Sequence, residues 1–313
     1  MTAHTAGLLL ATAMLVAAAS TKPSQGERGF LFVATGEAVR ALNKPRGGLY
    51  DGDLATALRG ACATGHPTRV IVETPGEAAE VARTTSPCDR VEVVALRNDT
   101  RRDVFSPHYG PLKSCRNENC QRRANLRRFK LEAILAGVDA FPSGTLLLDN
   151  DVTIRRGGGP ELFAVFDAMQ RSKKAVGLTE APHCVADKHH IEDVPEKFCE
   201  RNGGVIFFGD AARSRSFVEE WLEEFDARPS PDGHDQLSLR RVLWRHKDAL
   251  YDVPKQIQCR TPLCGNPCGP KVKERPLLWH AHHRVRAKRA AGGKSKGYEK
   301  EFQRKGSICG FLV

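Results

Sequence analysis

Two carboxylates stand one residue apart directly after an apolar run in the middle of the chain. The run 146–148 is all leucine, and Asp149, Asn150 and Asp151 follow it. On an extended chain, residues i and i+2 point to the same side, so these carboxylates repel each other unless a cation or a donor lies between them. Hard oxygen ligands of this kind suit Mg²⁺, Mn²⁺ or Ca²⁺. At the end of a sheet strand the pair predicts a platform for a metal and a diphosphate, although a simple acidic turn also fits.

A basic segment lies about twenty residues before this pair. Arg127, Arg128 and Lys130 fall in 122–136, where the spacing of apolar residues predicts a helix. Arginine is suited to bidentate contacts with phosphate. A solvated helix face explains the same residues equally well.

Three polar groups follow later in the chain. They are Asn202-Gly203-Gly204 before the apolar run 205–208, Asp235-Gln236 at the start of a predicted helix, and the histidines His280, His282 and His283. The glycines permit close backbone approach to a ligand, or form a plain turn. Asp235 can accept a proton from a hydroxyl group, or cap the helix that follows it. Imidazole is a frequent metal ligand, and His280 and His282 face one side if 277–283 is extended, although a run of histidines also fits a polar surface.

Alternating strands and helices must position these residues. Apolar runs predict strands at 30–34, 69–72, 91–96, 145–148, 175–178 and 205–208. Helical spacing predicts helices at 50–63, 77–83, 122–136, 160–172, 214–225 and from 235 onward. The first strand ends at Thr35 and Gly36. This order predicts an α/β fold with a mostly parallel, doubly wound sheet, at whose carboxyl edge ligands bind.

The charge of the chain is strongly basic and locally concentrated. The 313 residues carry a net charge of +11, and many lysines and arginines lie in the segment 286–313. Basic surfaces attract phosphates, nucleic acids or anionic lipids, so a secreted basic protein that binds polyanions is one alternative function. Only 7% of the residues are aromatic, which leaves few platforms for stacking bases. We therefore expect no nucleic-acid partner.

The amino terminus and the cysteines indicate a secretory route. Residues 7–19 are almost wholly apolar, a length that fits a signal peptide, or a short signal anchor, over 1–20. Ten cysteines fit an oxidising compartment, and Cys115 with Cys120 is a plausible local pair. The cluster Cys259, Cys264 and Cys268 predicts disulfides, with a zinc site as the alternative. A glycosylation sequon begins at Asn98.

The ordered set of motifs resembles the GT-A glycosyltransferases that use nucleotide-diphospho-sugars. Those families have an Asp-any-Asp strand end, an Asn-Ser/Thr-Gly strand start and a later Asp-Gln pair. The resemblance covers about 29–284. It implies a single GT-A (Rossmann-like) domain over 27–285, with a mostly parallel mixed sheet flanked by helices, and a basic tail over 286–313. It also implies a location in the Golgi lumen or outside the cell, with membrane contact only through an N-terminal anchor.

The resemblance implies roles for the residues named above. The metal, Mn²⁺ or Mg²⁺, would be held by Asp149, Asp151 and a histidine, His280 or His282, with His283 as a further choice. The nucleotide-sugar donor, more naturally a UDP-sugar than a GDP-sugar, would contact Thr35, Gly36, Arg127, Lys130, Asp149, Gly203 and Gly204. The catalytic residues would be Asp235, Gln236 and Asn202, and the acceptor would be a glycan or a glycoprotein. The Asp-Gln form favours the families that retain the configuration of the sugar.

The acidic pair also fits a rival enzyme class. In a HAD-type phosphatase, Asp149 would be the nucleophile and Asp151 the acid/base. That motif normally opens its domain, whereas about 120 residues that we expect to be folded precede it in this chain. The later acidic motif of that class is also missing, because Gly209-Asp210 is followed by Ala-Ala-Arg-Ser.

Overall fold

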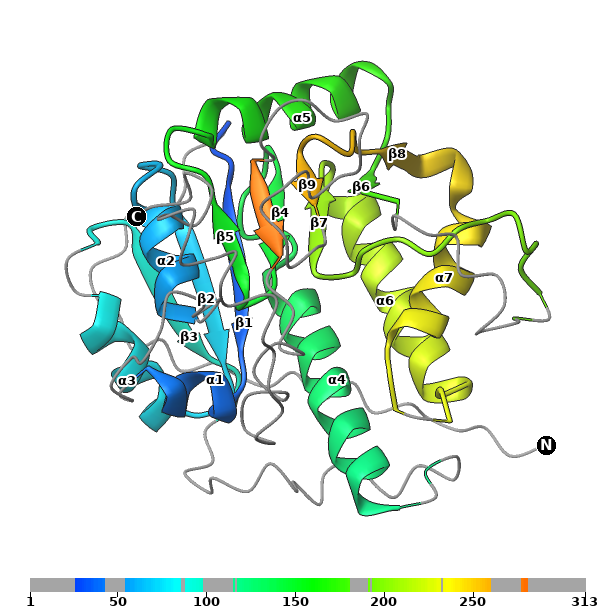
Figure 1. Ribbon diagram of the computed structural model, residues 1–313, viewed down its shortest axis with the longest axis horizontal. Coiled ribbons are helices and arrows are strands. Elements are labelled where there is room, and N and C mark those ends of the chain that lie inside the picture. The colour runs from blue at the N-terminus through cyan, green and yellow to red at the C-terminus, as the bar shows by residue number, and fades with distance from the viewer. Residues whose placement is uncertain are drawn as a thin grey trace, which may run out of the picture.

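A seven-stranded mixed sheet forms the centre of the protein (Figure 1). The computed structural model describes residues 26–42, 54–85, 88–97, 115, 117–180, 191, 193–231, 233–259 and 277–280. The strands are β1 (Gly29–Ala34), β2 (Thr68–Val72), β3 (Val91–Ala95), β4 (Thr145–Leu148), β6 (Val176–Leu178), β7 (Val205–Phe208) and β8 (Leu250–Asp252). Their order is β3-β2-β1-β4-β7-β6-β8. Strand β7 is antiparallel to both neighbours, and the other described pairs in this sheet are parallel. The predicted α/β fold with a mostly parallel mixed sheet is confirmed.

Helices bury both faces of this sheet. Successive strand residues point to opposite faces, so Phe30 and Leu146 join the core beneath α2 (Leu54–Cys62), α3 (Pro75–Thr85) and α5 (Gly159–Arg171). Leu31 and Leu147 join the core beneath α4 (Glu118–Gly137), α6 (Ala211–Ala227) and α7 (Gln236–Arg245). Burial on both faces explains why the central strands are continuous apolar runs rather than alternating ones.

A small second sheet follows the acidic pair. It contains β5 (Val152–Ile154), β9 (Gln258–Cys259) and β10 (Leu278–His280). Strand β10, orange in Figure 1, runs antiparallel to β5 and parallel to β9. In this register His280 lies opposite Val152, the residue after Asp151. The pairing therefore brings the end of the described chain back to the acidic pair.

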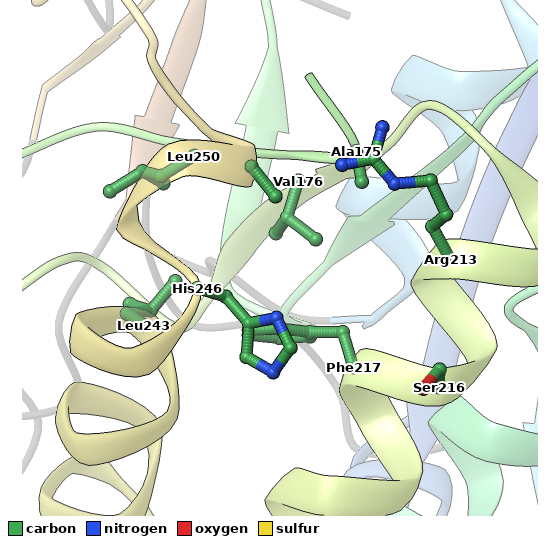
Figure 2. A pocket seen from close by; sticks show the side chains of 9 residues that line it. Ala175, Val176, Arg213, Ser216, Phe217, Leu243, His246 and Leu250 are labelled. Carbon is green, nitrogen blue, oxygen red and sulfur yellow. The ribbon is translucent and has the colours of Figure 1, made fainter. Parts of the chain in front are cut away.

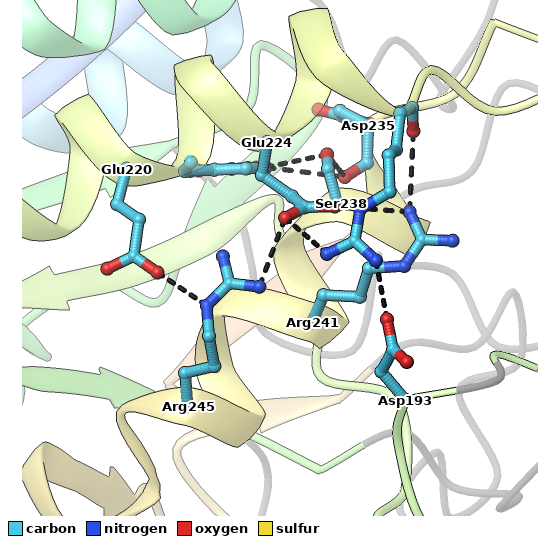
Figure 3. Close-up of polar contacts among 9 residues, drawn as sticks. Asp193, Glu220, Glu224, Asp235, Ser238, Arg241 and Arg245 are labelled. Carbon is cyan, nitrogen blue, oxygen red and sulfur yellow. Dashed lines mark hydrogen bonds and ion pairs between the residues drawn. The ribbon is translucent and has the colours of Figure 1, made fainter.

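Ion pairs hold α7 against α6 (Figure 3). Glu224 of α6 is buried, and its carboxylate accepts hydrogen bonds from Arg241 and Arg245 of α7 at 3.3 and 3.0 Å. Arg228 binds the same carboxylate at 2.7 Å. Because Asp235 and Gln236 lie at the start of α7, this network places them relative to the sheet.

Several elements differ in extent from the sequence prediction. The helix expected at 122–136 is the longer α4, because the Asn117 side chain accepts a hydrogen bond from the Cys120 backbone and so caps an earlier start. Likewise Asp210 caps α6 three residues before the predicted start, through the Arg213 backbone. The short elements α1 (Gly36–Ala41), η1 (Lys247–Ala249), β5, β8 and β9 were not predicted, since runs of two to six residues carry little periodic signal.

Two disulfides lie within the described residues. Cys115 is bonded to Cys120, which confirms the predicted local pair, and Cys62 is bonded to Cys88. Among the described helices, none is both long and apolar enough to cross a bilayer. The segments 1–20 and 286–313, the Asn98 sequon and the side chains of Cys259, Cys264 and Cys268 lie outside the described part of the chain.

Candidate functional site

Two carboxylates and one imidazole converge just beyond the end of β4. Asp151 Oδ1 lies 3.0 Å from His280 Nε2, and Asp149 Oδ2 lies 3.9 Å from the same nitrogen. Asp151 and His280 are buried, and Asp149 is partly exposed. The three side chains each offer one ligand atom, and these atoms all lie within 4.8 Å of one another.

This donor set fits a hard or borderline divalent cation. Oxygen ligands lie about 2.0–2.6 Å from Mg²⁺ or Ca²⁺, so ligands on one ion stand at most about 5 Å apart. Carboxylates suit Mg²⁺ and Mn²⁺, and imidazole suits the transition metals. The side chains of Asp149, Asp151 and His280 therefore meet both the distance and the chemistry that one such ion needs.

Lys130 supplies a cation beside the cluster. Its Nζ donates to Asp149 Oδ1 at 2.6 Å and to the Gly203 carbonyl at 3.3 Å, and its side chain is buried. Burial raises the pKa of Asp149, but the positive charges of Lys130, His280 and Arg127 and the Lys130 hydrogen bond outweigh this effect and lower the pKa to about 2. Asp149 is thus ionised at any ordinary pH.

The segment 202–204 surrounds His280 and Asp149. The Asn202 Oδ1 accepts from the Gly204 backbone N–H at 3.0 Å, which turns its Nδ2 toward His280 Nδ1 at 3.1 Å. The Gly204 carbonyl in turn accepts from the Asp149 backbone N–H at 2.7 Å. Asn202 therefore orients the imidazole, as partners of metal-binding histidines commonly do.

The two glycines are required by close packing. A Cβ on Gly204 would lie 2.6 Å from Asp149 Oδ2 and closer still to His280 Cε1. A Cβ on Gly203 would lie 2.9 Å from Gln236 Oε1 and 3.0 Å from Leu239 Cδ2. Any side chain at Gly204 would fill the space that the candidate ligands occupy.

Asp235 is a buried carboxylate that does not cap its helix. It precedes α7 in a right-handed helical conformation, and its side chain makes no capping hydrogen bond. Its Oδ1 lies 3.7 Å from Arg127 Nε. The negative charge of Asp235 raises the pKa of Arg127, and the charges of Asp149 and Asp151 add to this effect. Burial lowers the pKa, but by less than the carboxylates raise it. The guanidinium of Arg127 thus interacts electrostatically with Asp235 and with both carboxylates of the acidic pair.

Gln236 joins the start of α7 to the residues before Asn202. Its Nε2 donates to the Arg201 carbonyl at 2.8 Å and to Glu200 Oε1 at 3.2 Å. Its oxygen lies against Gly203. Gln236 therefore contacts the segment 202–204 that surrounds His280 and Asp149, whereas Asp235 lies beside Arg127.

The remaining predicted residues lie at other places. Thr35 and Gly36 follow β1, which pairs with β4, so they lie at the same edge of the sheet as the acidic pair. The guanidinium of Arg128 binds Asp226 of α6 at 2.9 Å, which makes it an interhelical contact. His282 and His283 lie outside the described residues. Arg201, whose contacts are given below, was missed by the sequence analysis because its residue type and neighbours carry no distinctive pattern.

A cavity lies away from the acidic cluster (Figure 2). Its volume is about 140 Å³, and its lining includes Val176, Phe217 and Leu250 with Arg213 and His246. It lies at the start of β6, whereas the acidic pair follows the end of β4, which is the opposite edge of the sheet. It contains no predicted site residue. We therefore base the functional argument on the acidic cluster.

The sequence matches no protein-family model and no curated protein. Solved structures with a similar arrangement include apo mouse xyloside xylosyltransferase 1, with a TM-score of 0.48, 13% identity and coverage of 81% of this chain and 97% of that one. A glycosyltransferase involved in glycosylating the major capsid of PBCV-1 has a TM-score of 0.42 and 12% identity, over 86% and 98% of the two chains. The 4-diphosphocytidyl-2C-methyl-D-erythritol synthase of Anaerococcus prevotii also scores 0.42 at 12% identity, over 73% and 87%. All these scores lie below 0.5, so the case for a function rests on the residues of the chain itself.

Proposed function

We propose that the protein is a metal-dependent glycosyltransferase that moves a sugar from a nucleotide-diphosphate donor, most naturally a UDP-sugar, to a glycan or a glycoprotein. The observation that carries the proposal is the convergence of Asp149, Asp151 and His280 beyond the end of β4, with Lys130 beside them. This is the edge of an α/β sheet at which ligands bind. A diphosphate needs concentrated positive charge there before it can leave.

The proposed metal is Mn²⁺ or Mg²⁺, held by Asp149, Asp151 and His280. When bound, it supplies Lewis acidity that neutralises the charge on the departing diphosphate. Asn202 orients His280, and Lys130 holds Asp149 in place. Arg127 has a partly exposed side chain 3.7 Å from Asp235, a position from which it can also bind a phosphate oxygen.

The proposed reaction exchanges two bonds at one sugar carbon. The bond from the anomeric carbon to the diphosphate oxygen breaks, the bond to the acceptor oxygen forms, and the acceptor hydroxyl gives up its proton. In this proposal Asp235, a buried carboxylate without a capping role, takes that proton or stabilises charge on the sugar. The Asp235-Gln236 pair favours retention, which the anomeric configuration of the product would report by NMR.

The decisive experiment is a screen of the purified protein against nucleotide sugars with and without Mn²⁺, following nucleotide release. We expect Mn²⁺-dependent release from one donor, and Asp151→Ala to abolish it while the circular dichroism spectrum stays unchanged. Asp139→Asn is the matched control, because Asp139 is an exposed carboxylate that binds Arg215 and precedes the start of β4, whereas the cluster follows the end of that strand.

The other outcomes of the screen separate the rival functions. Full activity of Asp151→Ala would refute the metal assignment. Phosphate release from a phosphoester that ignores added nucleotide sugar would instead indicate a phosphatase. Tight binding to polyanions without turnover of either substrate class would indicate a binding protein.

A further inference from the structure

The segment 202–204 interrupts the pairing between β6 and β7. Val176 pairs with Phe208 and Gly177 with Phe207, so the same register would place Gly204 opposite Glu180. Glu180 instead forms a β-bridge with Arg201, which lies three residues before Gly204 in the chain. Asn202, Gly203 and Gly204 are therefore an insertion into the ladder, of the kind that re-aims side chains near functional sites. We call this segment the 202–204 bulge.

Each residue of the 202–204 bulge contacts the candidate metal site. Asn202 reaches His280, the Gly203 carbonyl accepts from Lys130, and the Gly204 carbonyl accepts from the Asp149 backbone. The geometry of the site thus depends on where this bulge is held.

Arg201 anchors the bulge where the ladder resumes. Its side chain is buried, with 7% of its surface exposed. One terminal nitrogen donates to Glu180 Oε2 at 3.1 Å and to the Cys199 carbonyl at 3.0 Å, and the other donates to Asp252 Oδ1 at 2.9 Å. The guanidinium also lies 5.3 Å from the centre of the Phe198 ring. Its planar fork joins the segment that follows β6 and the last residue of β8 to the chain that enters the bulge.

The backbone of Arg201 extends this connection to α7. Its carbonyl accepts from Gln236 Nε2, and the next residue, Asn202, donates its backbone N–H to the Thr179 carbonyl at 3.0 Å. Arg201 is therefore the residue at which the Asp-Gln pair, the end of β6 and the bulge meet.

We propose that Arg201 is a positioning residue for the metal site, acting through the 202–204 bulge on His280 and Asp149. This inference rests on the proposed function, but its first test is independent of that function, because it is made on the metal-free protein. Without the guanidinium fork, the bulge loses its fixed end, Asn202 no longer holds the imidazole, and the metal ligands lose their preset geometry.

The first measurement is amide hydrogen exchange across 199–206 in the metal-free protein, comparing wild type with Arg201→Met. We expect the amides of Asn202 and Gly204 to exchange at least tenfold faster in the variant. Arg240→Met is the matched control, because Arg240 is also buried and binds the carbonyls of Pro195, Glu196 and Phe198, in the segment before Arg201. We expect it to leave the exchange of the bulge unchanged.

The second measurement is the affinity for Mn²⁺ by calorimetry. We expect Arg201→Met to weaken binding about tenfold or more, Arg201→Lys to recover part of the loss, and Arg240→Met to stay within about twofold of wild type. If Arg201→Met does not fold, the double variant Glu180→Gln/Asp252→Asn weakens two anchors by removing the charge of partly exposed partners, and should shift both readouts in the same direction.

The results distinguish the two proposals. Unchanged exchange in the 202–204 bulge, or faster exchange with unchanged Mn²⁺ affinity, would overturn the positioning role. A wild-type protein that binds Mn²⁺ but releases no nucleotide from any donor would refute the proposed function and leave the positioning role supported by the first two readouts. A wild-type protein that binds no divalent cation would overturn both.

Discussion

At the scale of single residues, the site depends on the absence of a side chain at Gly204 as much as on its functional groups. Gly204 leaves the space in which His280 and Asp149 approach each other. The sequence shows the glycine, but not which side chains need its space, because those side chains come from segments that are far apart in the chain. The same limit applies to Lys130, which the sequence could not rank above Arg127.

We predict that Gly204→Ala disables the site. The new methyl group overlaps Asp149 Oδ2, so the ligands must move, and overpacking of this kind costs about 1–3 kcal/mol of folding free energy. Calorimetry should show at least a tenfold loss of Mn²⁺ affinity. Gly76→Ala is the control, because a Cβ there would meet only Thr74 Oγ1, at 4.0 Å. Wild-type affinity in Gly204→Ala would contradict the packing argument.

We also predict that Lys130→Met makes the protein more dependent on metal. The change leaves Asp149 without its closest cation, and since Asp149 is partly exposed, we expect a loss of about 1–3 kcal/mol rather than the larger cost of a fully buried charge. Mn²⁺ should then stabilise the variant more than the wild type, because Lys130 no longer competes for Asp149 Oδ1. Urea unfolding with and without Mn²⁺ measures this difference, and equal metal stabilisation of both proteins would refute it.

At the scale of elements, the sequence predicted the long strands and helices but not the short pieces that complete the site. The runs that became β1, β4 and β7 are apolar enough to be recognised alone. Strands β5 and β10 have three residues each and find each other across more than a hundred residues. Their pairing places His280 beside the acidic pair, and no local pattern contains that information.

The contact between α6 and α7 should respond to pH through Glu224. Burial raises the pKa of Glu224, but the hydrogen bonds and positive charges of Arg228 and Arg245 lower it by more than burial raises it. The pKa of Glu224 therefore lies below its ordinary value of 4.5. A carboxylate with a depressed pKa stabilises the fold above the unfolded value, and this contribution is lost as the pH falls through the lower, folded value.

We therefore expect Glu224→Gln to cost about 1–3 kcal/mol at pH 7, and the difference from wild type to shrink as the pH falls below about 4.5. Urea unfolding at several pH values measures it. Glu223→Gln serves as the control, because Glu223 is an exposed neighbour on the same helix. A difference that does not change with pH would show that charge is not what joins the two helices.

At the scale of the whole molecule, disulfide cross-links add to a conventional core. The domain limits 27–285, the signal segment and the basic tail remain predictions, as does the secretory location. The α/β class was predictable because both faces of each central strand are apolar. The closure of the second sheet was not, since it depends on contacts between distant parts of the chain.

The Cys62–Cys88 disulfide joins the end of α2 to the start of the segment that enters β3. Closing a loop with a sequence separation of 26 removes freedom from the unfolded chain, which predicts a loss of about 3 kcal/mol in the Cys62→Ala/Cys88→Ala variant. Thermal melts of the variant and the wild type, both without reductant, measure this loss, because reductant would also open the Cys115–Cys120 disulfide. A variant that melts at the wild-type temperature would show that the bond contributes nothing to stability.

The candidate metal site depends on the antiparallel pairing of β5 with β10, so metal binding indicates whether these two strands have assembled in register. A slip of one residue between these strands would turn His280 and Leu278 to the other face, while the seven-stranded sheet could keep its own pairing. The protein can thus reach its main architecture before it can bind a metal. During refolding, Mn²⁺ affinity should appear after the far-ultraviolet signal of the sheet. The delay between the two signals would measure how late the final described strand, β10, docks.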